Sequence, residues 1–313
     1  MDVNFEYYRS FYYVAKYGNF TKAARALGNS QPNITRAMNL LEQEVGCTLF
    51  IRTNRGVRLT PEGERLYIRV SAAMAQLLAA EEELTDRTGL EHGSISIGAT
   101  ETALNIYLLD QLRAFHMEHP GIRLKISNHS TPQALRSLKN GEVDLAVVTT
   151  PADVQPPFQE VRLRPFREIL VGGKTFTALG SQQLSLAELL EYPFICLGKE
   201  TMTYQFYRQV FLSHGLELEP DTEAATTDQI LPLVRAELGL AFLPEPMAEE
   251  ALRQGSIVRI QVKEPIPERQ VCLVYDRQRP LSAAARKLKE GCWPAGEDLW
   301  AEQPNRFSRK CKR

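Results

Sequence analysis

Apolar residues in the first sixty positions recur at the three- and four-residue spacing of amphipathic helices. A first helix ending near Gly18 has an apolar face made of Phe5, Tyr8, Tyr12 and Ala15. A short second helix follows, for which Thr21 adds a capping hydroxyl and Gly28 suits a left-handed stop. Ser30 then suits the N-cap of a third helix, with Pro32 in its first turn. The pattern therefore predicts three helices joined by tight turns.

The third helix has an apolar face and an opposite polar face. Its apolar residues are Ile34, Ala37, Met38, Leu41 and Val45. Helix, tight turn and helix form the helix-turn-helix motif, whose second helix enters the major groove with its N-terminal end. Polar side chains there can reach base edges or phosphates, so we predict DNA contacts from Thr21, Ser30, Gln31, Pro32, Asn33, Thr35, Arg36 and Asn39. A solvated helix face is the alternative interpretation of these residues.

Two short extended pieces follow the third helix, in the segment LFIRTNRGVRLTPEG. A turn at Asn54-Arg55-Gly56 joins them, which predicts a β-hairpin wing. We predict that Arg52 and Arg55 lie along a phosphate backbone. The local charge agrees with this prediction, because residues 1–60 contain eight Lys/Arg and four Asp/Glu.

A long helix is predicted from Pro61, because no breaker follows Gly63 until Gly89. Apolar residues alternate along it at spacings of four and three: Leu66, Val70, Ala73, Leu77, Ala80 and Leu84. This is a heptad seam, on a helix of about 40 Å. A lone helix has no use for such a seam, so we predict a homodimer through residues 61–92. Two winged domains in one dimer would suit an operator with two half-sites.

Short apolar strands alternate with helices from Gly93 onward. Strands are predicted in SISIGA, IRLKIS, VDLAVV and EILVGG, and helices in ALNIYLLDQLRAFHMEHPG and PQALRSLKNG. Such alternation indicates a mostly parallel, doubly wound α/β sheet. The last strand, RQVCLVYD, and the last helix, SAAARKLKEG, have no immediate partner, so we predict that they return to the first half. Two chain crossings, near 164–167 and 265–269, would then act as hinges between two lobes.

These elements divide the chain into five parts. We predict a winged helix-turn-helix domain over 1–60, a linker and dimerisation helix over 61–92, a first regulatory lobe over 93–165 and 267–295, a second lobe over 166–266, and a basic, disordered tail over 296–313. A chain of 313 residues with 43% hydrophobic and 24% charged residues can build several cores of this kind.

Composition and motifs exclude several other classes of protein. The sequence has no run of eighteen apolar residues and no secretory signal pattern, so we expect a cytoplasmic protein without a membrane partner. Its five cysteines are scattered, with no CxxC pair or Cys/His cluster, which predicts reduced thiols and no metal site. The GxGxxG, GxxxxGK[ST], GxSxG and HExxH motifs are all missing, so we expect no enzyme.

An ordered set of positions resembles the N-terminal pattern of LysR-type transcriptional regulators: Asn19-Phe20-Thr21, Ala23-Ala24, Leu27, Ser30-Gln31-Pro32, Leu41-Glu42, Gly46, Leu49-Phe50, Arg52, Leu59-Thr60 and Gly63. Thr35 stands where serine is common in that family. The segments HPGIRL, NGEVDLAVV and RAELGLAFLPE are similar to its regulatory domain. The resemblance implies a two-lobe α/β effector-binding domain whose fold is similar to that of periplasmic solute-binding proteins. It also implies double-stranded promoter DNA, a small-molecule effector and RNA polymerase as partners, and a homodimer or homotetramer.

Ligands in such two-lobe sheets bind at the carboxyl ends of the strands, in the cleft between the lobes. Helices that begin there present free N–H groups. We therefore predict effector contacts from residues at these helix starts: Thr100, Glu101, Thr102, Ser130, Thr131, Thr201, Met202, Thr203 and Thr226. For each one, an ordinary helix cap is the alternative. Glu101 would repel an anion, so we expect an effector that carries both charges, such as an amino-acid derivative.

Two other functions fit parts of the sequence. A solute-binding module would account for residues 93–291 but would leave the first ninety residues without a role. A regulator without a small-molecule ligand would leave the cleft between the lobes without a role. We expect no bound cofactor other than an unidentified small-molecule co-inducer. The choices between activator and repressor, and between dimer and tetramer, stay open at this point.

Overall fold

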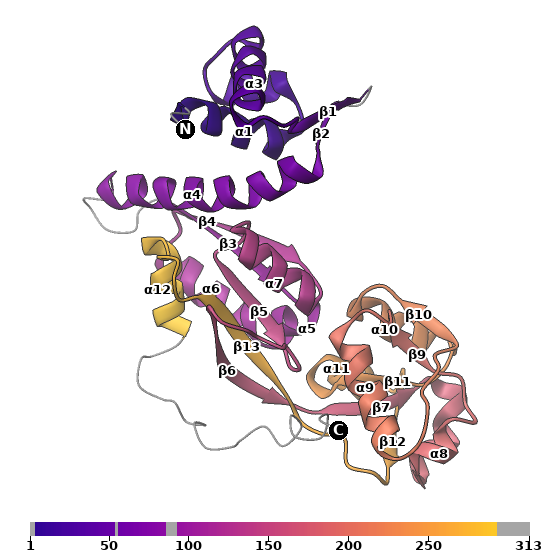
Figure 1. Cartoon of the computed structure of the whole chain (residues 1–313). Helices are drawn as coiled ribbons and strands as arrows, with labels where there is room; N and C mark the ends of the chain where they lie inside the picture. The colour runs from indigo at the N-terminus through magenta and orange to yellow at the C-terminus, as the bar shows by residue number, and fades with distance from the viewer. Residues whose placement is uncertain (1–3, 54–55, 86–92, 293–313) are drawn as a thin grey trace.

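The structure, a computed structural model, describes residues 4–53, 56–85 and 93–292. A small helical domain at the N-terminus is followed by one long helix, α4, and then by two α/β lobes (Figure 1). This arrangement confirms the predicted fold class. Within these residues, no helix has both the length and the apolar character that crossing a membrane requires. The predicted tail (296–313) and Arg55 lie outside the described residues.

The N-terminal domain contains three helices and a hairpin: α1 (Phe5–Tyr17), α2 (Phe20–Ala26), α3 (Gln31–Val45), β1 (Phe50–Thr53) and β2 (Gly56–Leu59). Its core is formed by apolar side chains from all three helices, among them Phe11, Ala23, Ile34, Met38 and Leu41. The two strands pair antiparallel and form the predicted wing. Glu42 joins α3 to the wing, because its Oε1 accepts hydrogen bonds from the amides of Leu49 (2.6 Å) and Phe50 (3.1 Å).

Side-chain caps fix the starts of α2 and α3. Ser30 is the N-cap of α3 and accepts a hydrogen bond from an amide of its first turn at 3.4 Å, which confirms the prediction. The capping prediction for Thr21 is wrong. Asn19 is the N-cap of α2, with its Oδ1 3.0 Å from a first-turn amide, because Thr21 already lies inside the helix. Gly28 has φ +60°, a left-handed conformation that glycine adopts without steric cost.

Lobe I is built on a five-stranded sheet with the order β4-β3-β5-β13-β6. Its strands are β3 (Gly93–Ala99), β4 (Ile122–Asn128), β5 (Leu145–Thr149), β6 (Phe158–Phe166) and β13 (Arg269–Asp276). The first three run parallel, and β13 runs antiparallel between β5 and β6. The helices are α5 (Glu101–Ala103), α6 (Leu109–Glu118), α7 (Thr131–Asn140) and α12 (Ala283–Cys292). Because β13 and α12 belong to this core, the predicted return of the last strand and helix is confirmed.

Lobe II contains a four-stranded sheet with the order β11-β7-β12-β8. These strands are β7 (Glu168–Gly172), β8 (Gln183–Leu184), β11 (Ala241–Pro244) and β12 (Val258–Val262). A parallel pair, β9 (Ile195–Leu197) and β10 (Thr222–Ala224), extends it through a single bridge from Phe194 to Leu240. Helical segments complete the lobe: η2 (Lys174–Ser181), α8 (Leu186–Leu189), α9 (Met202–Ser213), α10 (Thr227–Arg235) and α11 (Glu245–Arg253).

The chain crosses between the lobes twice. It leaves lobe I at Arg167, between β6 and β7, and returns between β12 and β13. Arg269, the first residue of β13, pairs with Phe166, the last residue of β6. The outgoing and returning segments therefore lie side by side where the lobes meet (Figure 1).

Two elements differ from what the sequence pattern predicts. The strand β6 was not predicted, because it is an edge strand whose two arginines leave it only partly buried. The helix predicted in ALNIYLLDQLRAFHMEHPG is interrupted, since a π-helical turn, η1 (Leu104–Leu108), separates α5 from α6. Insertions of this type are frequent at functional sites.

The first half of the long helix α4 (Pro61–Thr85) packs into the N-terminal domain, and a later part of it is exposed. Leu66 packs against the N-terminal core, and Val70 and Met74 are buried in it. Leu77 is 44% exposed. The first part of the predicted heptad seam is therefore used inside the chain, and Leu77 is available on the surface. The side chains of Ala80 and Leu84 are not among those described.

Helix α4 also contacts lobe I. The buried hydroxyl of Ser71 donates a hydrogen bond to the carbonyl oxygen of Asn140, at the end of α7, at 2.9 Å. Arg279 donates to two further carbonyl oxygens of this helix end, at 3.1 and 3.3 Å. Burial, with Tyr12 and Glu142 nearby, raises the pKa of Tyr67 to about 12. The linker helix is thus packed against the DNA-binding domain at one end and lobe I along its side.

Candidate functional site

The start of α3 presents most of its polar side chains to solvent. Gln31, Asn33, Arg36 and Asn39 are exposed, as are Thr21, Ser30 and Pro32. Thr35 is half-buried. The apolar face of the same helix, with Ile34 and Leu41, is buried in the core, so the polar face points away from it. The structure therefore brings these predicted residues together on one accessible surface.

Asn29 organises the turn between α2 and α3. Its Oδ1 accepts hydrogen bonds from the amide of Ser30 at 2.8 Å and from Nδ2 of Asn33 at 3.0 Å. Asparagine at a turn of this kind commonly bonds nearby backbone and side-chain donors. Asn29 thus fixes the orientation of Asn33 at the start of the reading helix.

On the wing, Arg58 of β2 is exposed. The backbone of Arg52 is part of β1, but its side chain is not among those described. The predicted phosphate contacts of Arg52 and Arg55 therefore stay predictions.

Several predicted effector residues cap helices at the junction of the lobes. Thr100 is the N-cap of α5, and its Oγ1 accepts the amide of Ala103 at 3.3 Å. Thr201 caps α9 in the same way, with a bond of 3.2 Å from the amide of Tyr204. Ser130 is the N-cap of α7. These hydroxyl groups already have partners within the protein.

The remaining predicted residues lie close to these helix starts. Thr226 is the N-cap of α10 without a side-chain capping bond, and Met202 is half-buried in the first turn of α9. The hydroxyl of Thr131 donates to the carbonyl oxygen of Thr149 at 3.4 Å. Thr102 and Thr203 line a small cavity between the lobes, which is described below.

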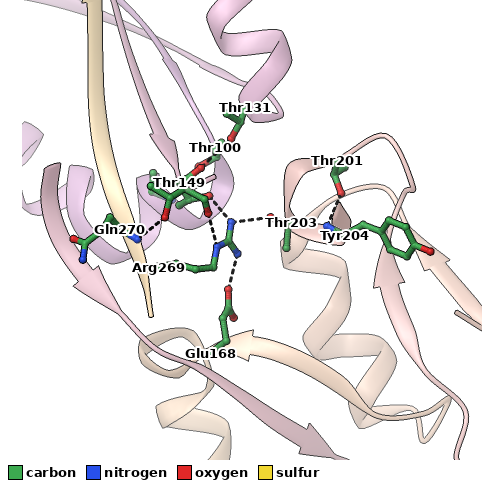
Figure 2. A network of polar contacts seen from close by, with 11 residues as sticks. Thr100, Thr131, Thr149, Glu168, Thr201, Thr203, Tyr204, Arg269 and Gln270 are labelled. Atoms are coloured by element: carbon green, nitrogen blue, oxygen red, sulfur yellow. Dashed lines mark hydrogen bonds and ion pairs between the residues drawn. The ribbon is translucent and has the colours of Figure 1, made fainter. Parts of the chain in front are cut away.

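Arg269 occupies the centre of the junction and is 1% exposed (Figure 2). On the lobe I side, its Nε donates to the carbonyl oxygen of Thr150 at 2.7 Å and its Nη2 to Oγ1 of Thr149 at 2.9 Å. On the lobe II side, it bonds Oε1 of Glu168 at 2.6 Å and Oγ1 of Thr203 at 3.1 Å. One guanidinium group therefore holds both lobes.

Aromatic rings complete the surroundings of this guanidinium. The ring of Phe166 lies 5.4 Å from Arg269 and the ring of Phe206 lies 5.2 Å from it. A cation over an aromatic face is favoured by about 0.5–2 kcal/mol, and more so when it is desolvated. The charge of Arg269 is thus balanced by one carboxylate and two aromatic rings inside the protein.

Glu168 is also buried, and its two oxygens have different surroundings. Oε1 pairs with Arg269, whereas Oε2 is buried without a hydrogen-bond partner. Glu168 lines a cavity of about 10 Å³ together with Thr102, Thr203 and Tyr207. Burial, followed by the charge of Glu168, raises the pKa of Tyr207 well above its ordinary value, so this phenol stays protonated.

A larger pocket of about 480 Å³ opens between α5 and η1 of lobe I and α10 and α11 of lobe II. Its polar lining includes Glu101, Asp228 and Arg235, and its apolar lining includes Leu231 and Met247. The volume lies within the range of ligand pockets, about 300–1,000 Å³. Thr227 lines both this pocket and the small cavity, so the two adjoin.

Glu101 is the acidic residue on which the sequence analysis based a doubly charged effector. Its carboxylate accepts hydrogen bonds from the amide groups of Asn105 at 2.7 Å and Asn128 at 2.9 Å. These bonds satisfy Glu101 at the edge of the pocket. The carboxylate oxygen without a hydrogen-bond partner is Oε2 of Glu168, at the centre of the junction.

Three cysteines have described side chains, and none of the three forms a disulfide. Cys47, Cys196 and Cys272 are free thiols. Burial, with Asp221 and Glu223 adding to it, raises the pKa of Cys196 to about 12. Burial beside Glu160 raises the pKa of Cys272 as well. Both groups therefore stay protonated near neutral pH.

Comparison with protein families assigns both halves of the chain. Residues 5–64 match the bacterial regulatory helix-turn-helix protein model of the lysR family, and residues 88–294 match the LysR substrate binding domain. The chain belongs to the LysR family. It is a DNA-binding transcriptional regulator with an effector-binding domain, and members of this family are regulators rather than enzymes.

Bacterial regulators are similar to this chain over almost its whole length. The RuBisCO operon transcriptional regulator of Allochromatium vinosum is 27% identical, over 93% of this chain and 95% of its own length. The regulator YofA of Bacillus velezensis is 26% identical, over 89% and 93% of the two chains.

Solved structures show the same fold. A full-length OxyR variant from Pseudomonas aeruginosa superposes with a TM-score of 0.73 at 20% identity, covering 93% of this chain and 95% of that one. Full-length CbnR, solved with its target DNA, superposes with a TM-score of 0.66 at 19% identity, covering 92% and 98%.

The sequence contained a partial signal for the central ion pair. Glu168 and Arg269 each begin a strongly apolar strand, Glu168 directly after the first predicted chain crossing and Arg269 at the end of the second. A charged residue at such a place has either an exposed position or a buried partner. Their separation of 101 residues prevents the sequence alone from pairing them.

We expect Arg269→Ala to destabilise the regulatory domain by about 3–5 kcal/mol, because the substitution leaves Glu168 buried without its counter-charge. The double variant Glu168→Met with Arg269→Met removes both charges at similar volume and should stay close to wild-type stability. Urea unfolding of the three proteins, followed by circular dichroism, measures the difference. Equal stability of Arg269→Ala and wild type would contradict this role for the pair.

Proposed function

We propose that this regulator reads its operator with the start of α3 and that the wing adds contacts to phosphates. It binds DNA as a homodimer held together through α4. A small molecule in the space between the lobes changes this binding. The observation that carries the proposal is the junction itself, where Arg269 bonds Thr149 of lobe I and Thr203 of lobe II beside a pocket of about 480 Å³.

The exposed side chains at the start of α3 support the assignment of the reading surface. Gln31 and Asn33 carry amide groups, which pair with adenine edges, and Arg36 carries a guanidinium, which pairs with guanine. Ser30 is placed to contact phosphate. The structure of CbnR was solved with its target DNA, and the same fold in this chain supports an equivalent docking.

The position of the effector is supported by the two adjoining cavities between the lobes. A ligand there contacts helix starts from both lobes, including α5, α9 and α10. A molecule that binds one arrangement of the lobes better than another shifts the population toward it. We assign the co-inducer to this place, and Thr102, Thr203, Glu101 and Thr227 to its surroundings.

The dimer is supported by the surface of α4. Leu77 is 44% exposed and Leu78 is 37% exposed, on the part of the helix beyond the N-terminal core. Leucines at such positions are typical of a helix that packs against a second helix. We infer that two copies of α4 pack together here, that two such dimers can form a tetramer, and that RNA polymerase is a further partner at the promoter.

Alanine at Gln31 or Arg36 should weaken operator binding by about 1–3 kcal/mol and relax the preference at the base pair that each residue reads. Electrophoretic mobility shifts on the operator and on single-base variants measure both effects. Arg113→Ala, which removes the same charge from an exposed site on α6, should leave binding unchanged. Unaltered affinity and base preference in both α3 variants would rule out this helix as the reader.

Leu77→Lys should shift the protein from dimer toward monomer, because it places a charge in the leucine seam of α4. Sedimentation velocity on the full chain measures the change, and Leu190→Lys, at an exposed leucine in lobe II, serves as the control. If Leu77→Lys stays dimeric at the same concentration as wild type, the dimer forms elsewhere.

A metabolite should alter the footprint of the purified full chain on the DNA that flanks its own gene. Bending or a change in half-site spacing appears as shifted protection or new hypersensitive sites. The experiment compares fractions of a host metabolite extract with buffer alone. An identical footprint with every fraction would overturn the effector part of the proposal while leaving the DNA part standing.

A further inference from the structure

One carboxylate oxygen of Glu168, at the lobe junction, lacks a hydrogen-bond donor. Its side chain is fully buried, with 0% exposed. Oε1 pairs with Arg269, but Oε2 is buried without any hydrogen-bond partner. A buried acceptor left without a donor is costly, and such atoms in native proteins commonly mark a place where a bound molecule completes the structure.

The protein provides apolar neighbours around this oxygen. The cavity that Glu168 lines is bounded by Ile195, Ile230, Phe242 and Pro244, which offer no side-chain donor. Tyr207 also lines it, and its protonated phenol interacts with the carboxylate of Glu168, which helps to raise the pKa of the phenol, but Oε2 has no donor within hydrogen-bond geometry. A molecule that enters the cavity can supply a well-placed donor.

The positive charge at the junction is already engaged. Arg269 makes four hydrogen bonds inside the protein, and the charge of Glu168 neutralises its own. An anionic group entering the small cavity would meet the carboxylate of Glu168 without a free guanidinium to offset it. The cavity therefore selects against an anion at this point.

The adjoining pocket of about 480 Å³ also disfavours an anion. Glu101 and Asp228 contribute two carboxylates to its lining, and Arg235 contributes one cation. Because Thr227 lines both spaces, one molecule can extend from the larger pocket into the small cavity. The acceptor-rich character of the junction thus continues outward from Glu168.

We propose that the effector of this regulator carries a hydroxyl or ammonium group that donates a hydrogen bond to Oε2 of Glu168. The proposal rests on the proposed function, since it names the chemical class of the molecule that occupies the interlobe space. Glu168 is then the residue that distinguishes an amino or hydroxy compound from its unsubstituted analogue. Its partner Arg269 holds the carboxylate in place and carries the effect to both lobes.

Two matched sets of probes test this directly. One is propionamide, lactamide and alaninamide, and the other is butyramide, 2-hydroxybutyramide and 2-aminobutyramide, none of which carries a carboxylate. Within a set, the members differ at one carbon, which bears hydrogen, hydroxyl or ammonium. Isothermal titration calorimetry on the full chain should show that a hydroxyl or ammonium member binds about tenfold tighter than its unsubstituted analogue.

The variant Glu168→Gln places an amide at the same position and should abolish this advantage. Glu250→Gln, the same chemical change at an exposed site on α11, should retain it. If Glu168→Gln does not fold, the double variant Glu168→Met with Arg269→Met provides a cavity with no acceptor and no buried charge, and it should also bind all members of a set equally.

Several results would overturn the proposal. These are the absence of binding by every probe, equal binding of the three members of each set to wild type, or an advantage that persists in Glu168→Gln and in the double variant. A crystal structure of the best complex in which Oε2 contacts only water or the Tyr207 hydroxyl would do the same.

The two proposals can fail separately. A metabolite that shifts the wild-type footprint and binds wild type and Glu168→Gln equally would leave effector control intact and remove the donor requirement. A footprint that responds to no metabolite would remove effector control, whatever the probes do.

Discussion

A single buried guanidinium connects the parts of the regulatory domain. Arg269 stands where the returning chain re-enters lobe I, beside the outgoing chain at Phe166, and it bonds residues of both lobes. Burying an ion pair has a large desolvation cost, which only good geometry and additional hydrogen bonds offset. Here, four hydrogen bonds and two aromatic rings supply them. Each lobe has cores of its own, and the contact between the lobes combines this polar network with the packing of Met247 of α11 against the core of lobe I.

Polar contacts of this kind suit a switch better than apolar packing does. Hydrogen bonds depend on direction and distance, so a small change in the arrangement of the lobes exchanges one set for another. The Thr203 bond joins Arg269 to the start of α9, and the Thr149 bond joins it to the end of β5. A bound molecule that competes for either partner acts on the junction directly. The exposed polar surface of α3 lies in a separate domain with a core of its own, so its side chains do not depend on the state of the cleft.

The sequence predicted best those features that depend on neighbours along the chain. Periodicity, Gly28 and the cap at Ser30 defined the helix-turn-helix, because each acts within one or two turns. The sequence did not predict specific contacts between segments that are distant along the chain. Glu168 and Arg269 are separated by 101 residues, and β6 is recognisable as a strand only beside β13. The heptad seam showed a third difficulty, since Leu66 and Val70 have the spacing of a dimer interface but pack into the chain's own core. Spacing identifies an apolar face, and the fold decides what covers it.

The hydrogen bond between Ser71 and Asn140 couples the orientation of α4 to that of lobe I. Its 25 residues extend for about 37 Å, and its first turns are fixed in the DNA-binding domain while its middle is fixed to lobe I. A rotation of about 5° at one end of a rod of this length displaces the other end by about 3 Å. Successive base pairs of DNA are about 3.4 Å apart along one strand. A rotation of a few degrees along α4 is therefore enough to displace one of its ends by a distance close to the spacing of base pairs.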